Sequence, residues 1–211
     1  MKVCIEGPAG ELEGVLWLPE GAPRAAIVLG HPHPLRGGSM DSSVVFRAGR
    51  ALQEVGLAVL RLNYRGVGTS AGTFDGEGGE VEDHRAALDW LEGEVAGVPL
   101  WAGGFSFGAR TAAALATCEE RIRQVLLIAL PVLAYPCALA DDVRCPGLVL
   151  MASGDAFGTA ADVKAVLPGL ASRVEVGELE GADHFFSGKL QELEARIGDW
   201  AQRALHTEPS P

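Results

Sequence analysis

The sequence predicts an α/β fold, a three-layer α/β/α sandwich built around a mostly parallel sheet of eight strands. Two observations support this prediction. Short apolar segments alternate with longer segments of helical pattern between Lys2 and Trp200, which is the order that right-handed strand–helix–strand crossovers produce. Most of the apolar segments are continuous rather than alternating, as in strands that are buried on both faces of a parallel sheet.

The first two strands are expected to form a hairpin, and six more follow along the chain. The predicted strands are Val3–Ile5, Gly14–Leu18, Ala25–Leu29, Ala58–Leu62, Leu100–Gly103, Val125–Ala129, Leu148–Met151 and Val174–Glu178. The predicted helices run from Asp41 or Ser42 to Gly56, from Val81 to Leu91, from Phe107 to Thr117, from Thr159 or Asp162 to near Pro168, and from Phe186 to Leu205. A (β/α)₈ barrel would need more strand–helix units than this chain contains.

Length and composition indicate one domain, residues 1–205, followed by a polar, proline-containing tail at residues 206–211 that is expected to be disordered. The formal net charge is −11. Such a charge disfavours binding to nucleic acid or to an anionic membrane, because both require a basic face. No apolar run is long enough to span a membrane and no export signal is evident, so a cytoplasmic protein is expected.

The four cysteines show no CxxC pair. Reduced and mostly buried thiols are therefore expected, with a disulfide between Cys137 and Cys145 as the alternative. The sequence contains no internal repeat, and it indicates no cofactor. Its oligomeric state is left open.

A candidate nucleophile, Ser106, lies in the run Gly104-Phe105-Ser106-Phe107-Gly108. Because the chain has 28 glycines, a G-x-S-x-G match alone is weak evidence. The context strengthens it, since a predicted strand precedes the run and a predicted helix follows it. Such a strand–turn–helix elbow exposes the serine at a strained turn and directs the free N–H groups of the helix toward it.

A serine hydroxyl needs a base, which a carboxylate in turn orients. Among the five histidines, His184 is the candidate base because it follows the last predicted strand and precedes the last predicted helix. His206 lies in the tail, and His84 is expected on a solvated, charged helix face. His31 and His33 belong to a separate loop.

Asp155 is the candidate acid, since it follows the predicted strand Leu148–Met151. The other aspartates have simpler interpretations. Asp162 is expected to cap a helix, while Asp141 and Asp142 precede the strand and so lie at its other end. Asp183 is next to His184 in sequence, and neighbours in an extended loop point apart.

The stretch His31-Pro32-His33-Pro34-Leu35, followed by Gly37-Gly38, is expected to supply part of an oxyanion hole. One donor should be the N–H of Phe107, directly after the nucleophile. Proline has no N–H, so either His33 or Leu35 is the second donor. A rigid turn with exposed histidines and a metal site built on His31 and His33 are the alternatives, although no third metal ligand at a suitable spacing is evident.

Four segments together resemble the α/β-hydrolase superfamily, and within it the small lidless bacterial serine hydrolases related to dienelactone hydrolase. The segments are the His31–Gly38 loop, Leu62-Asn63-Tyr64-Arg65-Gly66-Val67-Gly68-Thr69-Ser70, Gly104–Gly108 and Gly181-Ala182-Asp183-His184-Phe185-Phe186. The resemblance implies carboxylesterase-like acyl transfer to water, with Ser106 and His184 at the positions of the nucleophile and base. It also implies a sheet of the α/β-hydrolase type.

The chain departs from the commoner pattern at two positions. Many relatives carry Gly-Asp-x-Asp after the seventh core strand, with the second Asp as the acid, and that alignment would place Phe157 there. The alternative uses the run Asp155-Ala156-Phe157-Gly158-Thr159, which is similar to a run in another branch, and restores Asp155. Dienelactone hydrolases have cysteine where this chain has Ser106, so lactone specificity does not carry over.

Only Leu130–Pro146 separates the sixth and seventh core strands, which is too short for the cap domain of larger relatives. An open site is therefore expected, with Leu35, Tyr135 and Phe185 contacting substrate and Phe74 and Leu133 nearby. Such a site favours small or short-acyl esters. A thioesterase or a peptidase with the same three residues, and a catalytically silent binding module, are the alternative functions.

Overall fold

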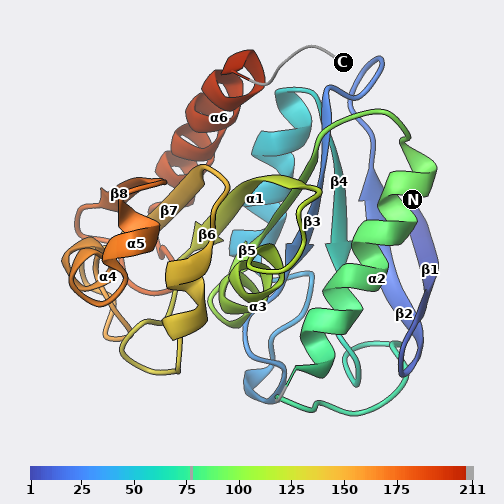
Figure 1. Cartoon of the computed structure of the whole chain (residues 1–211), viewed down its shortest axis with the longest axis horizontal. Helices are drawn as coiled ribbons and strands as arrows, with labels where there is room; N and C mark the ends of the chain where they lie inside the picture. The colour runs from blue at the N-terminus through green and yellow to red at the C-terminus, as the bar shows by residue number, and fades with distance from the viewer. Residues whose placement is uncertain (77, 208–211) are drawn as a thin grey trace.

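The computed structural model describes residues 1–76 and 78–207 of the chain, and it confirms the predicted fold class (Figure 1). Eight strands form one sheet in the order β1-β2-β4-β3-β5-β6-β7-β8. Their bounds are β1 Lys2–Gly7, β2 Gly10–Trp17, β3 Ala25–Gly30, β4 Leu57–Leu62, β5 Leu100–Phe105, β6 Ile122–Ile128, β7 Gly147–Ala152 and β8 Glu175–Leu179. The pairs β1–β2 and β2–β4 are antiparallel, and every other neighbouring pair is parallel.

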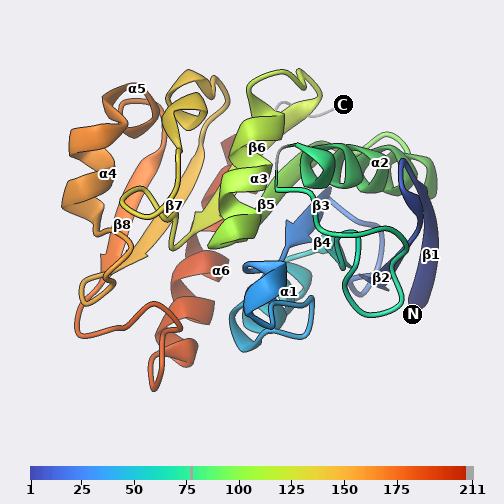
Figure 2. The ribbon, with the colours of Figure 1, turned by 90° about the horizontal axis from the view of Figure 1, so that it is seen from below.

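Helices cover both faces of the sheet, so that three layers are seen edge-on (Figure 2). The helices are α1 Ser43–Glu54, α2 Gly79–Glu94, α3 Phe107–Ala116, α4 Ala160–Val166, α5 Pro168–Ala171 and α6 Leu190–Thr207, with short 3₁₀ helices η1 Pro34–Arg36 and η2 Ala138–Asp142. Apolar residues of α2, α3, α4 and α5 pack in one core, and those of α1 and α6 pack in the other. Both cores are needed because β3, β4, β5 and β7 are buried along their whole length, and β6 is buried everywhere except at Arg123.

The direction of winding changes between β3 and β5, which are paired although β4 lies between them in sequence. The chain leaves β3 toward α1 on one face of the sheet, whereas it leaves β5 toward α3 on the other. In open α/β sheets, ligands bind at such a switch point, outside the carboxyl ends of the strands. The loops after β3, β5, β7 and β8 all leave this edge, because these four strands run in parallel.

The predicted helix Phe186–Leu205 begins later and ends later than expected. Phe186 and Gly188 have positive φ angles of 54° and 71°, which an α-helix does not allow, so α6 begins only at Leu190. His206 and Thr207 belong to α6 rather than to the tail. Residues 208–211 lie outside the described residues.

All four cysteines are free, including Cys137 and Cys145. The expectation of mostly buried thiols is wrong for Cys4 and Cys118, which are exposed. Cys4 lies on the edge strand β1, where alternate side chains face solvent. In the described part of the chain, no helix is both long and apolar enough to cross a membrane.

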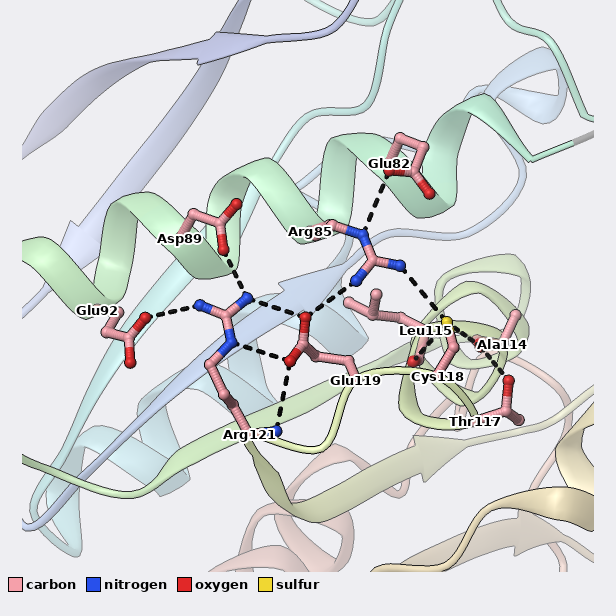
Figure 3. Close-up of polar contacts among 10 residues, drawn as sticks. All are labelled: Glu82, Arg85, Asp89, Glu92, Ala114, Leu115, Thr117, Cys118, Glu119 and Arg121. Carbon is pink, nitrogen blue, oxygen red and sulfur yellow. Dashed lines mark hydrogen bonds and ion pairs between the residues drawn. The ribbon is translucent and has the colours of Figure 1, made fainter.

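An ion-pair network joins α2 to the start of β6 (Figure 3). The guanidinium of Arg121 contacts Glu119, Asp89 and Glu92 at 2.9, 2.6 and 2.6 Å. Arg85 of α2 also contacts Glu119, at 2.9 Å. The hydrogen bond from the Arg121 side chain is the main cause that lowers the pKa of Glu119 to about 2.

Arg121→Gln is expected to lower the free energy of unfolding by about 1 kcal/mol at pH 7. The loss is modest because the Arg121 side chain is 37% exposed and solvent screens its charge. The folded-state pKa of Glu119 is below its unfolded value, so this stabilisation is present above about pH 4.5 and is lost as the pH falls toward 2. Urea unfolding of the wild-type protein and of Arg121→Gln should show a smaller difference in the free energy of unfolding at pH 3 than at pH 7.

Arg123→Gln is the matched control, since Arg123 is an exposed arginine two residues further along the chain, on β6. We expect it to leave the free energy of unfolding within about 0.5 kcal/mol of the wild-type value. An equal loss in both variants would contradict a specific role for Arg121.

Candidate active site

Ser106 occupies the turn between β5 and α3, as predicted. Its φ and ψ angles are 55° and −113°, a strained conformation for a residue other than glycine. The surrounding structure maintains it, because the Ser106 N–H donates to the carbonyl oxygen of Ile128 on β6 at 2.8 Å and the Ser106 carbonyl accepts from the N–H of Arg110 on α3. The side chain of Ser106 is thus held at the carboxyl end of the sheet.

The two glycines of the pentapeptide are needed because the backbone is crowded around the turn. A Cβ on Gly104 would lie 2.5 Å from the carbonyl carbon of Gly108. A Cβ on Gly108 would lie 2.4 Å from the carbonyl oxygen of Gly30, at the end of β3. Both distances are shorter than a van der Waals contact, so any larger residue would push α3 away from the sheet. This packing explains why glycine stands two residues before and two residues after Ser106.

His184 and Asp155 form a hydrogen-bonded chain with Ser106. His184 lies after β8, and its Nε2 is 3.0 Å from the Oγ of Ser106. Its Nδ1 is 2.6 Å from the Oδ2 of Asp155, which lies after β7. An ionised carboxylate only accepts hydrogen bonds. The proton of the neutral imidazole is therefore on Nδ1, and Nε2 is free to accept the Ser106 hydroxyl proton.

The side chain of Asp155 is fully buried. Besides His184, its other oxygen, Oδ1, accepts the backbone N–H of Phe157 at 2.8 Å. The commoner sequence pattern would place the acid at position 157. Instead, the ring of Phe157 lies edge-on to the imidazole of His184, with 4.7 Å between ring centroids.

The competing aspartates are engaged elsewhere. Asp162 forms a capping box with Thr159 at the start of α4, as expected. Asp141 accepts the N–H of Leu170. Asp183 accepts the N–H groups of Phe185 and Ser187, and the bond from Ser187 is the largest cause that lowers the pKa of Asp183.

The two candidate donors of the His31–Gly38 loop differ in the structure. The N–H of Leu35 donates to Nδ1 of its neighbour His33 at 3.2 Å. Within the described residues, the backbone N–H of His33 has no acceptor. The ring of His33 also packs on that of Phe107, at 5.3 Å between centroids, and the N–H of Phe107 is the first of α3, where helix geometry leaves it unpaired. His33 and Phe107 are therefore the available pair of donors.

His31 is a structural residue, fully buried beneath the loop. Its Nδ1 donates to the Pro32 carbonyl at 2.6 Å, and its Nε2 accepts the N–H of Tyr64 at 3.2 Å. Burial lowers its pKa to about 4. The accepting nitrogens of His31 and His33 are thus both engaged by backbone N–H groups, so neither offers a metal the lone pair it would need.

The expectation that His84 is solvated is wrong. His84 is fully buried on α2, its Nδ1 is 2.9 Å from the hydroxyl of Tyr64, and burial lowers its pKa to about 4. The charged pattern around it misleads because Asp83 is also buried, where it pairs with Arg65 at 2.7 Å. No local sequence signal indicates a pairing across 18 residues.

A cleft of about 550 Å³ lies over Ser106 and His184. The residues that line it are Pro32, His33, Arg36, Gly37, Gly38, Ser42, Ser106, Tyr135, Phe157, His184 and Phe185. Tyr135 and Phe185 thus lie where the sequence predicts, whereas Leu35 is 72% exposed and is not among the lining residues. Phe74 packs behind the His33 ring. Sequence reasoning missed Arg36 and Ser42, because only folding brings these loop residues into the cleft.

Comparisons with known proteins identify the family of the chain. A family model described as an alpha/beta hydrolase domain matches residues 23–206. A protein of Rickettsia prowazekii is 36% identical, over 94% of this chain and 87% of its own length. An alpha-beta serine hydrolase homologue from Coxiella burnetii is 36% identical with a TM-score of 0.88, over 94% of this chain and 96% of that one.

A serine hydrolase without a lid, from Xanthomonas campestris, is 33% identical with a TM-score of 0.90, over 99% of this chain and 96% of that one. The connection between β6 and β7 is also short in this chain and contains only η2. These matches confirm the resemblance inferred from the motifs. The chain belongs to the α/β-hydrolase family.

Proposed function

We propose that this α/β hydrolase cleaves small or short-acyl carboxylic esters through an acyl-enzyme formed on Ser106. The observation that carries the proposal is the hydrogen-bonded chain of Ser106, His184 and Asp155, with distances of 3.0 and 2.6 Å. These three residues come from separate loops, so only the tertiary fold brings them within hydrogen-bonding distance. Esterases and serine proteases of several folds use the same geometry.

In the proposed mechanism, Oγ of Ser106 attacks the ester carbonyl while Nε2 of His184 takes its proton. Asp155 holds the imidazole in the required tautomer and stabilises the imidazolium that forms. The oxyanion accepts hydrogen bonds from the N–H groups of Phe107 and His33. His184 then protonates the leaving alcohol, and a water molecule attacks the acyl-enzyme by the reverse proton transfers to release the acid and free Ser106.

The cleft supports a preference for small substrates. It measures about 550 Å³, within the usual range for small-molecule sites. Between β6 and β7 the chain has room only for η2, so this connection supplies no cap helix that would enclose a long acyl chain. The aromatic rings of Tyr135, Phe157 and Phe185 provide an apolar surface beside Ser106, which suits a short alkyl or aryl group.

A panel of p-nitrophenyl esters from acetate to dodecanoate tests this preference. We expect kcat/KM to be highest for acetate to butyrate and at least roughly tenfold lower for dodecanoate, which corresponds to about 1.4 kcal/mol of lost transition-state binding. Short-acyl thioesters and a peptide anilide are assayed beside them. Faster turnover of dodecanoate, of a thioester or of the anilide would contradict the proposed substrate class.

A further inference from the structure

Arg36 places a positive charge in the wall of the cleft. It ends η1 on the same short loop that carries His33, and it lines the cleft together with Ser106 and His184. Burial is the main cause that lowers the pKa of His33, so that ring is neutral at pH 7. Among the described residues that line the cleft, Arg36 is thus the one side chain with a permanent charge.

The charge of Arg36 is not balanced by the protein itself. The chain has 28 acidic and 17 basic residues, and eight arginines of the described residues form ion pairs with carboxylates, as Arg65 does with Asp83. In the part of the chain that the structure describes, no carboxylate forms an ion pair with Arg36. The two aspartates next to His184 are engaged as well, since Asp155 binds His184 and Asp183 accepts backbone N–H groups.

The loop fixes the backbone position from which the exposed Arg36 side chain extends. The N–H groups of Arg36 and Gly38 both donate to the carbonyl of His33, at 3.0 and 3.2 Å, and the N–H of Gly37 donates to that of Pro34. The backbone of Arg36 is therefore tied to His33, whose own N–H is a proposed oxyanion donor. Ser42 adds a hydroxyl that lines the cleft and makes no capping bond to its own helix.

We propose that Arg36 binds a carboxylate of the substrate, so that the preferred substrates are esters that carry a second, ionised carboxyl group. This inference rests on the proposed function, because it assigns a substrate class to that same site. A guanidinium binds a carboxylate through two parallel hydrogen bonds, which provides orientation as well as affinity. The aromatic rings hold the apolar part of the substrate, and the Ser42 hydroxyl can donate to the same carboxylate.

The net charge of −11 does not prevent such binding. Repulsion between an anionic substrate and distant surface carboxylates is screened over roughly 8 Å at physiological ionic strength. Arg36 is itself exposed, but a direct hydrogen-bonded contact is far shorter than this screening length, so it keeps more of its Coulomb attraction than the distant charges keep of their repulsion. Arg36, the one arginine among the described residues that line the cleft, therefore determines the local preference.

Two pairs of esters, each differing only in charge, test the proposal on either side of the ester bond. Monoethyl adipate and ethyl adipamate compare a carboxylate with an amide on the acyl side, and 3-acetoxybenzoate and 3-acetoxybenzamide compare them on the alcohol side. We expect the wild-type protein to favour the carboxylate by at least roughly tenfold in kcat/KM for one pair. In Arg36→Gln this ratio should fall to about one, and Arg36→Lys should keep part of it.

Arg24→Gln is the matched control, because Arg24 is exposed at the opposite end of β3 and forms no part of the cleft. Its ratio of kcat/KM for the carboxylate ester to kcat/KM for the amide ester should equal that of the wild-type protein. A wild-type ratio of one or less in both pairs would overturn the proposal, and so would a ratio that survives in Arg36→Gln.

A binding measurement separates this proposal from the proposed function. NMR titration of Ser106→Ala with 3-acetoxybenzoate should show saturable binding that is lost in Ser106→Ala/Arg36→Gln. If no ester is cleaved by the wild-type protein but this binding difference is present, esterase function fails and the carboxylate site stands. If esters are cleaved and the binding difference is absent, the carboxylate site fails alone.

Discussion

Ser106→Ala is expected to lower kcat for p-nitrophenyl acetate by at least about 10⁴-fold, because the acyl-enzyme can no longer form. The residual rate would come from the donors that stabilise the oxyanion and from binding alone. The fold should survive. Alanine tolerates the φ angle of 55° about as well as serine does, and among the described residues the Ser106 hydroxyl hydrogen-bonds only to His184.

Labelling by a fluorophosphonate tests the role of Ser106 without an ester substrate. The wild-type protein should be labelled at Ser106, and Ser106→Ala should not be labelled. Ser43→Ala is a suitable control, since Ser43 is an exposed serine at the start of α1. Near-wild-type turnover by Ser106→Ala, or equal labelling of it, would show that Ser106 is not the nucleophile.

The nucleophile and the base could be located from sequence because each is marked by local structure. A buried strand, a turn rich in glycine and a helix surround Ser106, and crowding at Gly104 and Gly108 explains the motif itself. His184 follows the last strand of the sheet. Such signals depend only on a few residues that are neighbours in sequence, so they can be recognised without the structure.

Residues that depend on distant partners could not be located in this way. His84 is in a charged helical segment, but burial of Asp83 against Arg65 turns this part of α2 toward the core. The exposed side chain of Leu35 and the cleft position of Arg36 follow from the path of η1. The order of hydrophobic residues specifies the layers of the fold, while the direction of each loop side chain depends on contacts across the sheet.

The loop after β7 shows both situations at once. The strand end predicts that an acid should follow it, but Asp155 and Phe157 are both compatible with motifs of related proteins. The structure separates them because Asp155 accepts hydrogen bonds from the N–H of Phe157 and from Nδ1–H of His184 together. The choice between the two positions thus depends on His184, which is 29 residues away in sequence.

Asp155→Asn is expected to lower kcat for p-nitrophenyl acetate by roughly 10³- to 10⁴-fold. The amide of asparagine can present an N–H to Nδ1 of His184, which would move the imidazole proton to Nε2. Nε2 would then be unable to accept the proton of Ser106. The asparagine oxygen can still accept the N–H of Phe157, so the loop should keep its conformation and the effect should be chemical.

The companion variant Asp162→Asn isolates this effect, because Asp162 is also an aspartate that accepts backbone N–H bonds, but at the cap of α4. It should reduce thermal stability slightly while kcat stays within about twofold of wild type. Asp155→Asn should show the reverse, with a melting temperature close to wild type and a large loss of kcat. If Asp155→Asn is nearly as active as wild type, another carboxylate must orient His184. The buried 2.6 Å contact between Asp155 and His184 would then be a structural hydrogen bond only.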